Sequence, residues 1–314
     1  MVNSRLRFLI GGIMKRYLSN PLAIAIFTLP AIILFGVFVF SPIIQVFGYS
    51  LFEWDGVNQA VFTGFENYRN LFATSVFSVA NINGFKFSAV ISLYQIILAT
   101  VFAIAVSNRR VRFRKFFRTV YFIPVVLSVT VVCQLWSSIL DPERGLLNAL
   151  FKAFGSDFRQ NWLGQRYRAI YAVAFVNAWQ WMGYQFALLV AGIKSIPQDY
   201  YEAAEIDGAS ALRSHWHVTI PLLKETYNFC LLVSITGGIK AFTEMQIMTG
   251  GGPGTATYTL TYIMYRNAFV SHRYGYGLAS ASVLVLECLA VIIVLNYLFR
   301  DREATRLRIK GGRL

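Results

Sequence analysis

The chain has 314 residues, of which 56% are hydrophobic and 14% are charged, and its mean hydropathy is +0.52. Because about 25% of the residues in soluble domains are charged, this composition excludes an ordinary soluble protein. The formal net charge of +14 is compatible with a nucleic-acid-binding protein, but in a membrane protein Lys and Arg serve first to orient the loops.

Six apolar stretches are long enough to cross about 30 Å of hydrocarbon as helices. They cover residues 22–50, 87–107, 119–140, 169–193, 227–248 and 276–299. Six helices place both chain termini on the same side of the membrane. The sequence therefore predicts an all-α polytopic membrane protein, with a transmembrane domain at 22–299 between tails at 1–21 and 300–314.

The basic residues are distributed unequally over the two sides of this predicted domain. Of the 29 Lys and Arg residues, 19 lie in the tails and in the loops on the same side, nine lie in the opposite loops, and Lys240 lies within a helix. Cytoplasmic loops are enriched in Lys and Arg, so both termini are predicted to be cytoplasmic. This bias explains most of the net charge and indicates contact with membrane lipid and not with nucleic acid.

Residues that could carry enzymatic or metal chemistry form no known motif, so no catalytic residue, metal or cofactor is expected in this chain. His215 and His217 have no third ligand nearby and are expected on the surface or in packing. The glycine-rich run at 250–254 lacks the Lys-Ser/Thr of a phosphate-binding loop and predicts a turn after the fifth helix. The three cysteines match no metal spacing and are expected to be reduced and packed; they are Cys133, Cys230 and Cys288.

The fourth predicted helix is rich in amide and aromatic side chains. They are Asn177, Trp179, Gln180, Trp181, Tyr184 and Gln185. Such side chains are suited to a sugar ring and its hydroxyl groups, because aromatic faces contact the ring and amides bond the hydroxyls. Hydrogen bonding between helices together with anchoring at the membrane interface is the alternative, and both interpretations stay open.

The segment at 195–223 predicts a helix, a break and a second helix. Ser195, with Gln198 three residues later and Pro197 between them, predicts a helix start with a capping box. Gly208 allows a positive φ that ends this helix, and the chain restarts through Leu212. The product is a short exposed helix, which is either a connector on the membrane surface or a docking helix for a partner's groove.

The fifth predicted helix carries Lys240 and Glu244, which are four residues apart and are expected on one face. An ion pair between them is favoured, and contact between Lys240 and an anionic saccharide is the alternative. Glu287 in the sixth helix is a further charge within the membrane, and packing against a partner chain is its expected role.

The segment at 202–221 resembles the cytoplasmic loop of permease subunits of binding-protein-dependent ABC importers, in particular the maltose-type carbohydrate branch. That loop has Glu-Ala-Ala, three residues, Gly, nine residues and then Ile-x-Leu-Pro. The matching positions here are Glu202, Ala203, Ala204, Gly208, Val218, Ile220 and Pro221, with Val218 and Ile220 as mild departures. The resemblance continues at 62–68, 108–110, 116–119, 141–148, 162–164 and 249–253.

The resemblance implies the permease fold of type I ABC importers, in which the loop at 195–223 sits in a cleft of an ATP-hydrolysing subunit. The residues implied to dock on the ATPase are Tyr200, Tyr201, Glu202, Ala203, Ala204, Asp207, Gly208 and Leu212. The residues expected along the substrate path are Asn177, Gln180, Trp181, Tyr184, Gln185, Lys240 and Glu244. ATP and Mg²⁺ would be bound by the partner ATPase subunits.

The resemblance also implies a multi-pass protein of the cytoplasmic (inner) membrane with a second homologous permease subunit, two ABC ATPase subunits and a solute-binding protein as partners. Its function would be oligosaccharide uptake by alternating access, driven by ATP hydrolysis on the partners. An acidic substrate such as alginate is a hypothesis that rests on Lys240 and the resemblance. A proton- or ion-coupled secondary transporter is the alternative, although such a carrier has no need of this docking loop.

Overall fold

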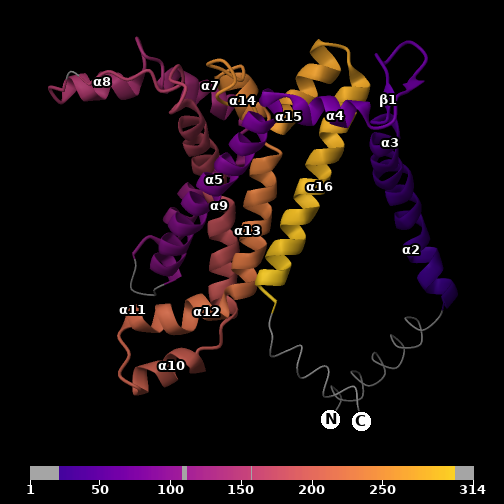
Figure 1. The fold of residues 1–314 in the computed structure, drawn as a ribbon. Coiled ribbons are helices and arrows are strands. Elements are labelled where there is room, and N and C mark those ends of the chain that lie inside the picture. The colour runs from indigo at the N-terminus through magenta and orange to yellow at the C-terminus, as the bar shows by residue number, and fades with distance from the viewer. Residues whose placement is uncertain (1–20, 108–111, 157, 301–314) are drawn as a thin grey trace.

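The structure is a computed structural model that describes residues 21–107, 112–156 and 158–300. The predicted tails at 1–21 and 300–314 therefore lie outside it except for residues 21 and 300. Its first element is a helical rod made of α2 (Pro21–Phe35), the π-helical turn η1 (Gly36–Phe40) and α3 (Ser41–Tyr49). Figure 1 shows α2 diverging from the other helices. The most apolar window of this rod is 0% buried within the described chain.

A short antiparallel hairpin and a helix connect the rod to the bundle. The hairpin pairs β1 (Phe52–Glu53) with β2 (Val61–Phe62), and α4 (Glu66–Ala73) follows it. The Asn67 side-chain amide on α4 donates to the carbonyl oxygens of Ser50 and Phe52, each at 2.9 Å. This buried amide holds α4 against the end of the rod, since buried backbone carbonyls need a donor.

Two long helices, α5 (Ser75–Ser107) and α9 (Ala169–Ser195), cross at the centre of the bundle, and α13 (Lys224–Ile239) and α16 (Tyr274–Leu298) pack beside them (Figure 1). Phe87 on α5 and Val173 on α9 are fully buried in the main apolar cluster. Gly183 allows α9 to approach its neighbour closely, because a Cβ atom there would collide with the carbonyl oxygen of Tyr121.

The third predicted span, at 119–140, is not one straight helix. It is divided into α6 (Arg114–Val126) and α7 (Val129–Ile139), which are bent by 99°. Leu127 and Ser128 are extended at the break, and the Leu127 carbonyl oxygen accepts a hydrogen bond of 3.0 Å from the side chain of Gln180. The prediction of one continuous helix was wrong because a side-chain donor on α9 replaces a backbone donor at the break.

The fifth predicted span, at 227–248, is also interrupted. α13 ends at Ile239, and α14 (Thr243–Met248) begins after Phe242, whose backbone is not helical. Thr259 stabilises this break by donating its hydroxyl to the Ala241 carbonyl oxygen at 2.9 Å. Lys240 and Glu244 therefore do not lie on one face of one helix, which corrects that expectation.

Among the described residues, three helices are long and apolar enough to cross a membrane. The number rises to five if each of two bent pairs is one span; these pairs are α6 with α7, and residues 211–222 with α13. The prediction of six spans also requires that α9 crosses the membrane. Its 27 residues correspond to about 40 Å, but Asn177, Gln180 and Gln185 lower its hydropathy. Those polar side chains face the interior, since all three are buried.

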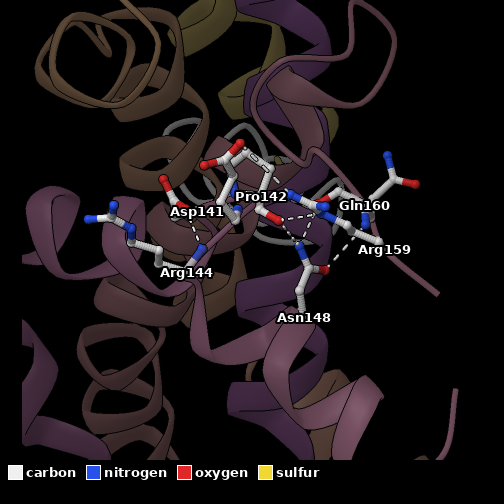
Figure 2. Close-up of polar contacts among 7 residues, drawn as sticks. Asp141, Pro142, Arg144, Asn148, Arg159 and Gln160 are labelled. Atoms are coloured by element: carbon white, nitrogen blue, oxygen red, sulfur yellow. Dashed lines mark hydrogen bonds and ion pairs between the residues drawn. The ribbon is translucent and has the colours of Figure 1, made fainter. Parts of the chain in front are cut away.

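The loop between α7 and α9 contains α8 (Leu146–Ala153), which projects sideways from the bundle (Figure 1). Figure 2 shows how Asn148 closes this loop by donating to the carbonyl oxygens of Pro142 and Gln160 at 3.3 and 3.0 Å. The Asp141 carboxylate accepts from the backbone N–H groups of Arg144 and Glu143, and these bonds hold the pKa of Asp141 below its ordinary value.

The chain continues from α14 through the predicted glycine-rich turn into α15 (Leu260–Tyr265) and the π-helical turn η3 (Arg266–Val270). Gly250, Gly251 and Gly254 all have positive φ, so the turn predicted at 250–254 is confirmed.

Cys133 and Cys230 are buried and Cys288 is half-buried, all as free thiols, in agreement with the expected packing role.

Candidate functional site

The segment at 195–223 forms a pair of short helices at one end of the bundle, beneath α9 and α13 (Figure 1). It consists of α10 (Asp199–Ile206), α11 (Ala211–Ser214), the π-helical turn η2 (His215–Thr219) and α12 (Ile220–Leu222). We call it the docking segment. The predicted helix, break and second helix are thus present.

The break falls at the predicted glycine. Gly208 has a φ of +76°, which a residue with a side chain rarely adopts, and its N–H donates to the Glu205 carbonyl oxygen. The second helix starts at Ser210, whose hydroxyl oxygen accepts a bond of 3.4 Å from the Arg213 N–H. The predicted capping box is wrong, because Ser195 is the last residue of α9 and its hydroxyl donates to the Gly192 carbonyl oxygen.

Most of the residues implied to dock on the ATPase lie on the surface of this segment. Tyr200, Glu202, Ala203, Asp207, Gly208 and Leu212 are exposed, whereas Tyr201 and Ala204 are half-buried. Large apolar side chains are exposed with them, since Ile206 is 87% and Leu212 is 78% accessible. Neighbouring exposed apolar side chains are typical of a surface that a partner covers.

Tyr201 points inward and connects the two helices of the docking segment. Its hydroxyl bonds the Thr219 hydroxyl at 2.9 Å, and the Thr219 hydroxyl also lies 3.0 Å from the His215 Nδ1. Thr219 is fully buried. His215 therefore has a packing role, as expected, and His217 bonds the Arg213 carbonyl oxygen on the surface. In the described part of the chain, no three His, Cys, Asp or Glu side chains are arranged to hold a metal ion.

A cavity of about 340 Å³ lies between α5, α9, α13 and α14, and we call it the central cavity. It is lined by six of the seven residues predicted along the substrate path. They are Asn177, Trp181, Tyr184, Gln185, Lys240 and Glu244. Gln180 is the exception, because its side chain turns away to the break between α6 and α7.

A chain of hydrogen bonds crosses one wall of the central cavity. Gln95 on α5 donates to the Asn177 Oδ1 at 3.3 Å, and the Asn177 Nδ2 donates to the Glu244 Oε1 at 2.6 Å. All three side chains are buried, so each needs a partner inside the protein. Sequence reasoning missed Gln95, although a glutamine within an apolar helix is a signal of an interior polar contact.

Lys240 and Glu244 line the same cavity without being paired. Lys240 is exposed at the end of α13, while Glu244 is buried in α14 and bonded by Asn177. Among the described residues, Arg159 forms an ion pair with Glu143, but Lys240 forms none with Glu244. The favoured prediction of an internal ion pair was therefore wrong, because the helix break separates the two residues.

The cavity also presents aromatic surface. Trp181 is about one third exposed, and Tyr184 is half-buried beside it. Gln185 donates its amide hydrogen to the Cys230 carbonyl oxygen at 3.3 Å, while its Oε1 has no partner among the described residues. Aromatic faces, amides, a carboxylate and an ammonium group together can contact sugar rings and donate to or accept from hydroxyl groups.

Comparison with known proteins places the chain in a family. A family model described as a binding-protein-dependent transport system inner membrane component matches residues 95–303. The chain is 36% identical over 285 residues to the probable ABC transporter permease protein YurN of Bacillus subtilis, covering 90% of this chain and 97% of that protein. It is 30% identical over 311 residues to the diacetylchitobiose uptake system permease protein NgcF of Streptomyces coelicolor, covering 94% and 85%.

A solved structure has the same fold. The chain superposes with a TM-score of 0.78 and 22% identity on a chain of a bacterial ABC transporter involved in the import of the acidic polysaccharide alginate. The match covers 92% of this chain and 98% of that one. At this identity the likeness shows the overall fold alone.

Proposed function

Because the chain belongs to the family of inner membrane components of binding-protein-dependent transport systems, as the permease subunit of an ABC carbohydrate importer, we propose that it conducts an oligosaccharide through the central cavity. The chain is a multi-pass protein of the inner membrane and is not itself an ATPase. The observation that supports the proposed path is the buried row of Gln95, Asn177 and Glu244 beside Trp181, since it combines fixed polar groups with an aromatic face.

The docking segment is the proposed contact with the ATPase subunit. Its exposed apolar side chains and the hydrogen bonds of Tyr201 support a rigid surface that a partner covers. α12 leads directly into α13, which lines the central cavity with Ser234 and Gly237. A displacement of the docking segment would therefore be passed to a cavity wall through one short turn.

The proposed complex contains a second homologous permease, two ATPase subunits that bind ATP and Mg²⁺, and a solute-binding protein. In this arrangement the docking segment and both termini face the cytoplasm, and the loop with α8 faces the outside. All six predicted apolar segments then cross the membrane, with the third and fifth as broken spans. The cavity would open alternately to either side as ATP is bound and hydrolysed.

An acidic oligosaccharide such as alginate is the finer proposal for the substrate. It is supported by Lys240, which lines the central cavity while Glu244 is bonded by Asn177 instead. An ammonium group in such a place can complement a uronate carboxylate. Glu244 lines the same cavity, so the acid group would lie toward Lys240 and the hydroxyl groups toward Glu244.

The test is ATP hydrolysis by the full complex in proteoliposomes, with the binding protein loaded with a neutral or a uronate oligosaccharide. Stimulation by either sugar supports the importer, and stimulation by the uronate alone supports the acidic substrate. Stimulation by the neutral sugar alone contradicts the acidic substrate and keeps the importer. Uptake by this chain without any ATPase subunit would contradict the importer and indicate a secondary transporter.

A further inference from the structure

A second cavity, of about 180 Å³, lies at the end of the bundle opposite to the docking segment. It is formed by α5, by the residues just before and at the start of α9, and by the loop after the glycine-rich turn, and we call it the outer basic pocket. Its charged side chains are Lys86 on α5 and Arg166 before α9. Neither the transport path nor the docking segment uses this pocket.

The charge of the outer basic pocket is uncompensated. No carboxylate lies among its lining residues, and neither Lys86 nor Arg166 forms an ion pair with any Asp or Glu that the structure describes. Because Lys86 and Arg166 line one small cavity, an anion bound in it can contact both cations. In the proposed orientation this pocket is on the outside, where basic residues are less common than on the cytoplasmic side.

The pocket lies at the boundary of the apolar helices and is accessible from water. Lys86 directly precedes the apolar stretch at 87–107, and Arg166 lies three residues before α9 begins. Both side chains are exposed, and two tyrosines flank them, with Tyr167 84% and Tyr171 50% accessible. Exposed Tyr and Arg side chains are enriched at the energetic centres of protein interfaces.

The walls of the pocket are held in place by buried hydrogen bonds. Asn83 is buried and donates to the carbonyl oxygens of Thr255, Ala256 and Tyr258, which fixes the loop that forms one wall. Arg168 donates to the Gln160 Oε1 at 2.5 Å, which ties the segment before α9 to the closed loop of Figure 2. The two cations are therefore presented on a preorganised surface, which lowers the cost of binding a partner.

The two helices that meet at this pocket also carry the polar row of the central cavity, with Gln95 on α5 and Asn177 on α9. An anion bound by both Lys86 and Arg166 would bridge the outer ends of these helices. The pocket is thus placed so that a partner outside the membrane can act on the helices that line the substrate path.

We propose that the outer basic pocket receives an acidic side chain of the solute-binding protein and is a docking point for that partner. The proposal rests on the proposed function, which requires a binding protein to dock on this end. It is supported by charge complementarity, since two cations and two tyrosines match one Asp or Glu carboxylate. A substrate carboxylate and a lipid phosphate are the competing occupants, and the experiment separates them.

The test uses the full complex in proteoliposomes and measures ATP hydrolysis against the concentration of substrate-loaded binding protein. The variant Lys86→Gln/Arg166→Gln is expected to raise the half-saturating concentration about tenfold, with the rate recovering at saturation, and to weaken its dependence on salt. The control Arg144→Gln/Lys152→Gln removes the same charge at the same end of the molecule but outside the pocket. This control is expected to leave the half-saturating concentration unchanged.

Equal half-saturation in the wild type and in Lys86→Gln/Arg166→Gln would overturn the proposal. So would a loss that appears only with acidic substrates or only in vesicles with anionic lipid, because these results would assign the pocket to the substrate or to a lipid. The charge-retaining variant Lys86→Arg/Arg166→Lys should stay near wild type, which separates lost charge from misfolding. A wild-type complex that no binding protein stimulates would contradict the proposed function itself and not the pocket.

Discussion

The Asn177 side chain on α9 donates a hydrogen bond to the Glu244 carboxylate on α14, with 2.6 Å between nitrogen and oxygen. Both residues are buried, and the bond joins the long central helix to the short helix beyond the break in the fifth span. One amide thereby stabilises a buried carboxylate and fixes a wall of the central cavity.

Replacing Asn177 with Leu is expected to lower the free energy of unfolding by about 1–3 kcal/mol, because Glu244 loses its buried donor. The double variant Asn177→Leu/Glu244→Met removes both partners of this bond and should recover the part of the loss that comes from Glu244, while Gln95 stays without its acceptor. Thermal unfolding of the purified complex measures both effects. Equal destabilisation by the single and the double variant would show that the hydrogen bond does not carry the effect.

Gly208→Val in the docking segment is expected to uncouple ATP hydrolysis from uptake. The left-handed backbone at φ +76° costs a residue with a side chain about 1–2 kcal/mol, and a β-branched residue tolerates it worst. Gly208→Asn is the matched control, since Asn adopts this conformation more readily. Uptake per ATP hydrolysed is the measurement, and unchanged coupling in Gly208→Val would count against the docking role.

Gln180→Leu is expected to destabilise the break between α6 and α7, because the Leu127 carbonyl oxygen loses its donor. The expected loss is about 1–3 kcal/mol in the free energy of unfolding. Gln134→Leu makes the same change at an exposed position on α7 and should have little effect. If both variants melt at the same temperature as the wild type, Gln180 does not stabilise the break.

Lys240→Met is expected to weaken uptake of acidic oligosaccharides about tenfold while neutral ones are affected less, because the ammonium group would complement a carboxylate of the substrate. Uptake of a uronate and a neutral oligosaccharide of equal length by the same proteoliposomes is the measurement. An equal loss for both sugars would assign Lys240 a structural role.

The docking segment contains features that could be predicted from the sequence and one that could not. Its break at Gly208 was predictable because a glycine after a short helix has a local signature, and the polar residues of α9 were predictable because such side chains are costly in hydrocarbon. The start of α10 was not, since Ser195 can equally end α9 by bonding its own helix. Local patterns of this kind do not distinguish the end of one helix from the start of the next.

The interruptions of the third and fifth helices could not be predicted from apolar periodicity. The sequence stays apolar up to Leu127, and the lysine next to Ala241 does not by itself end a helix. The donors that satisfy these two carbonyl groups, Gln180 and Thr259, are distant in the sequence. The same limit explains the wrong prediction of an ion pair between Lys240 and Glu244, because residues four apart lie on one face only in an unbroken helix. Gln95 carries the same signal as the polar residues of α9, but its contact with Asn177 on another helix could not be predicted from local sequence.

The packing of the chain has a consequence for its biosynthesis. The rod leaves the ribosome before the bundle helices, and because its apolar window is 0% buried by the described chain, its insertion into lipid does not have to wait for them. The centre of the bundle is different, since α5 has to remain in the membrane until α9 has been synthesised. During that interval Gln95 on α5 lacks its partner Asn177, so the early intermediate carries an unpaired polar side chain within the membrane.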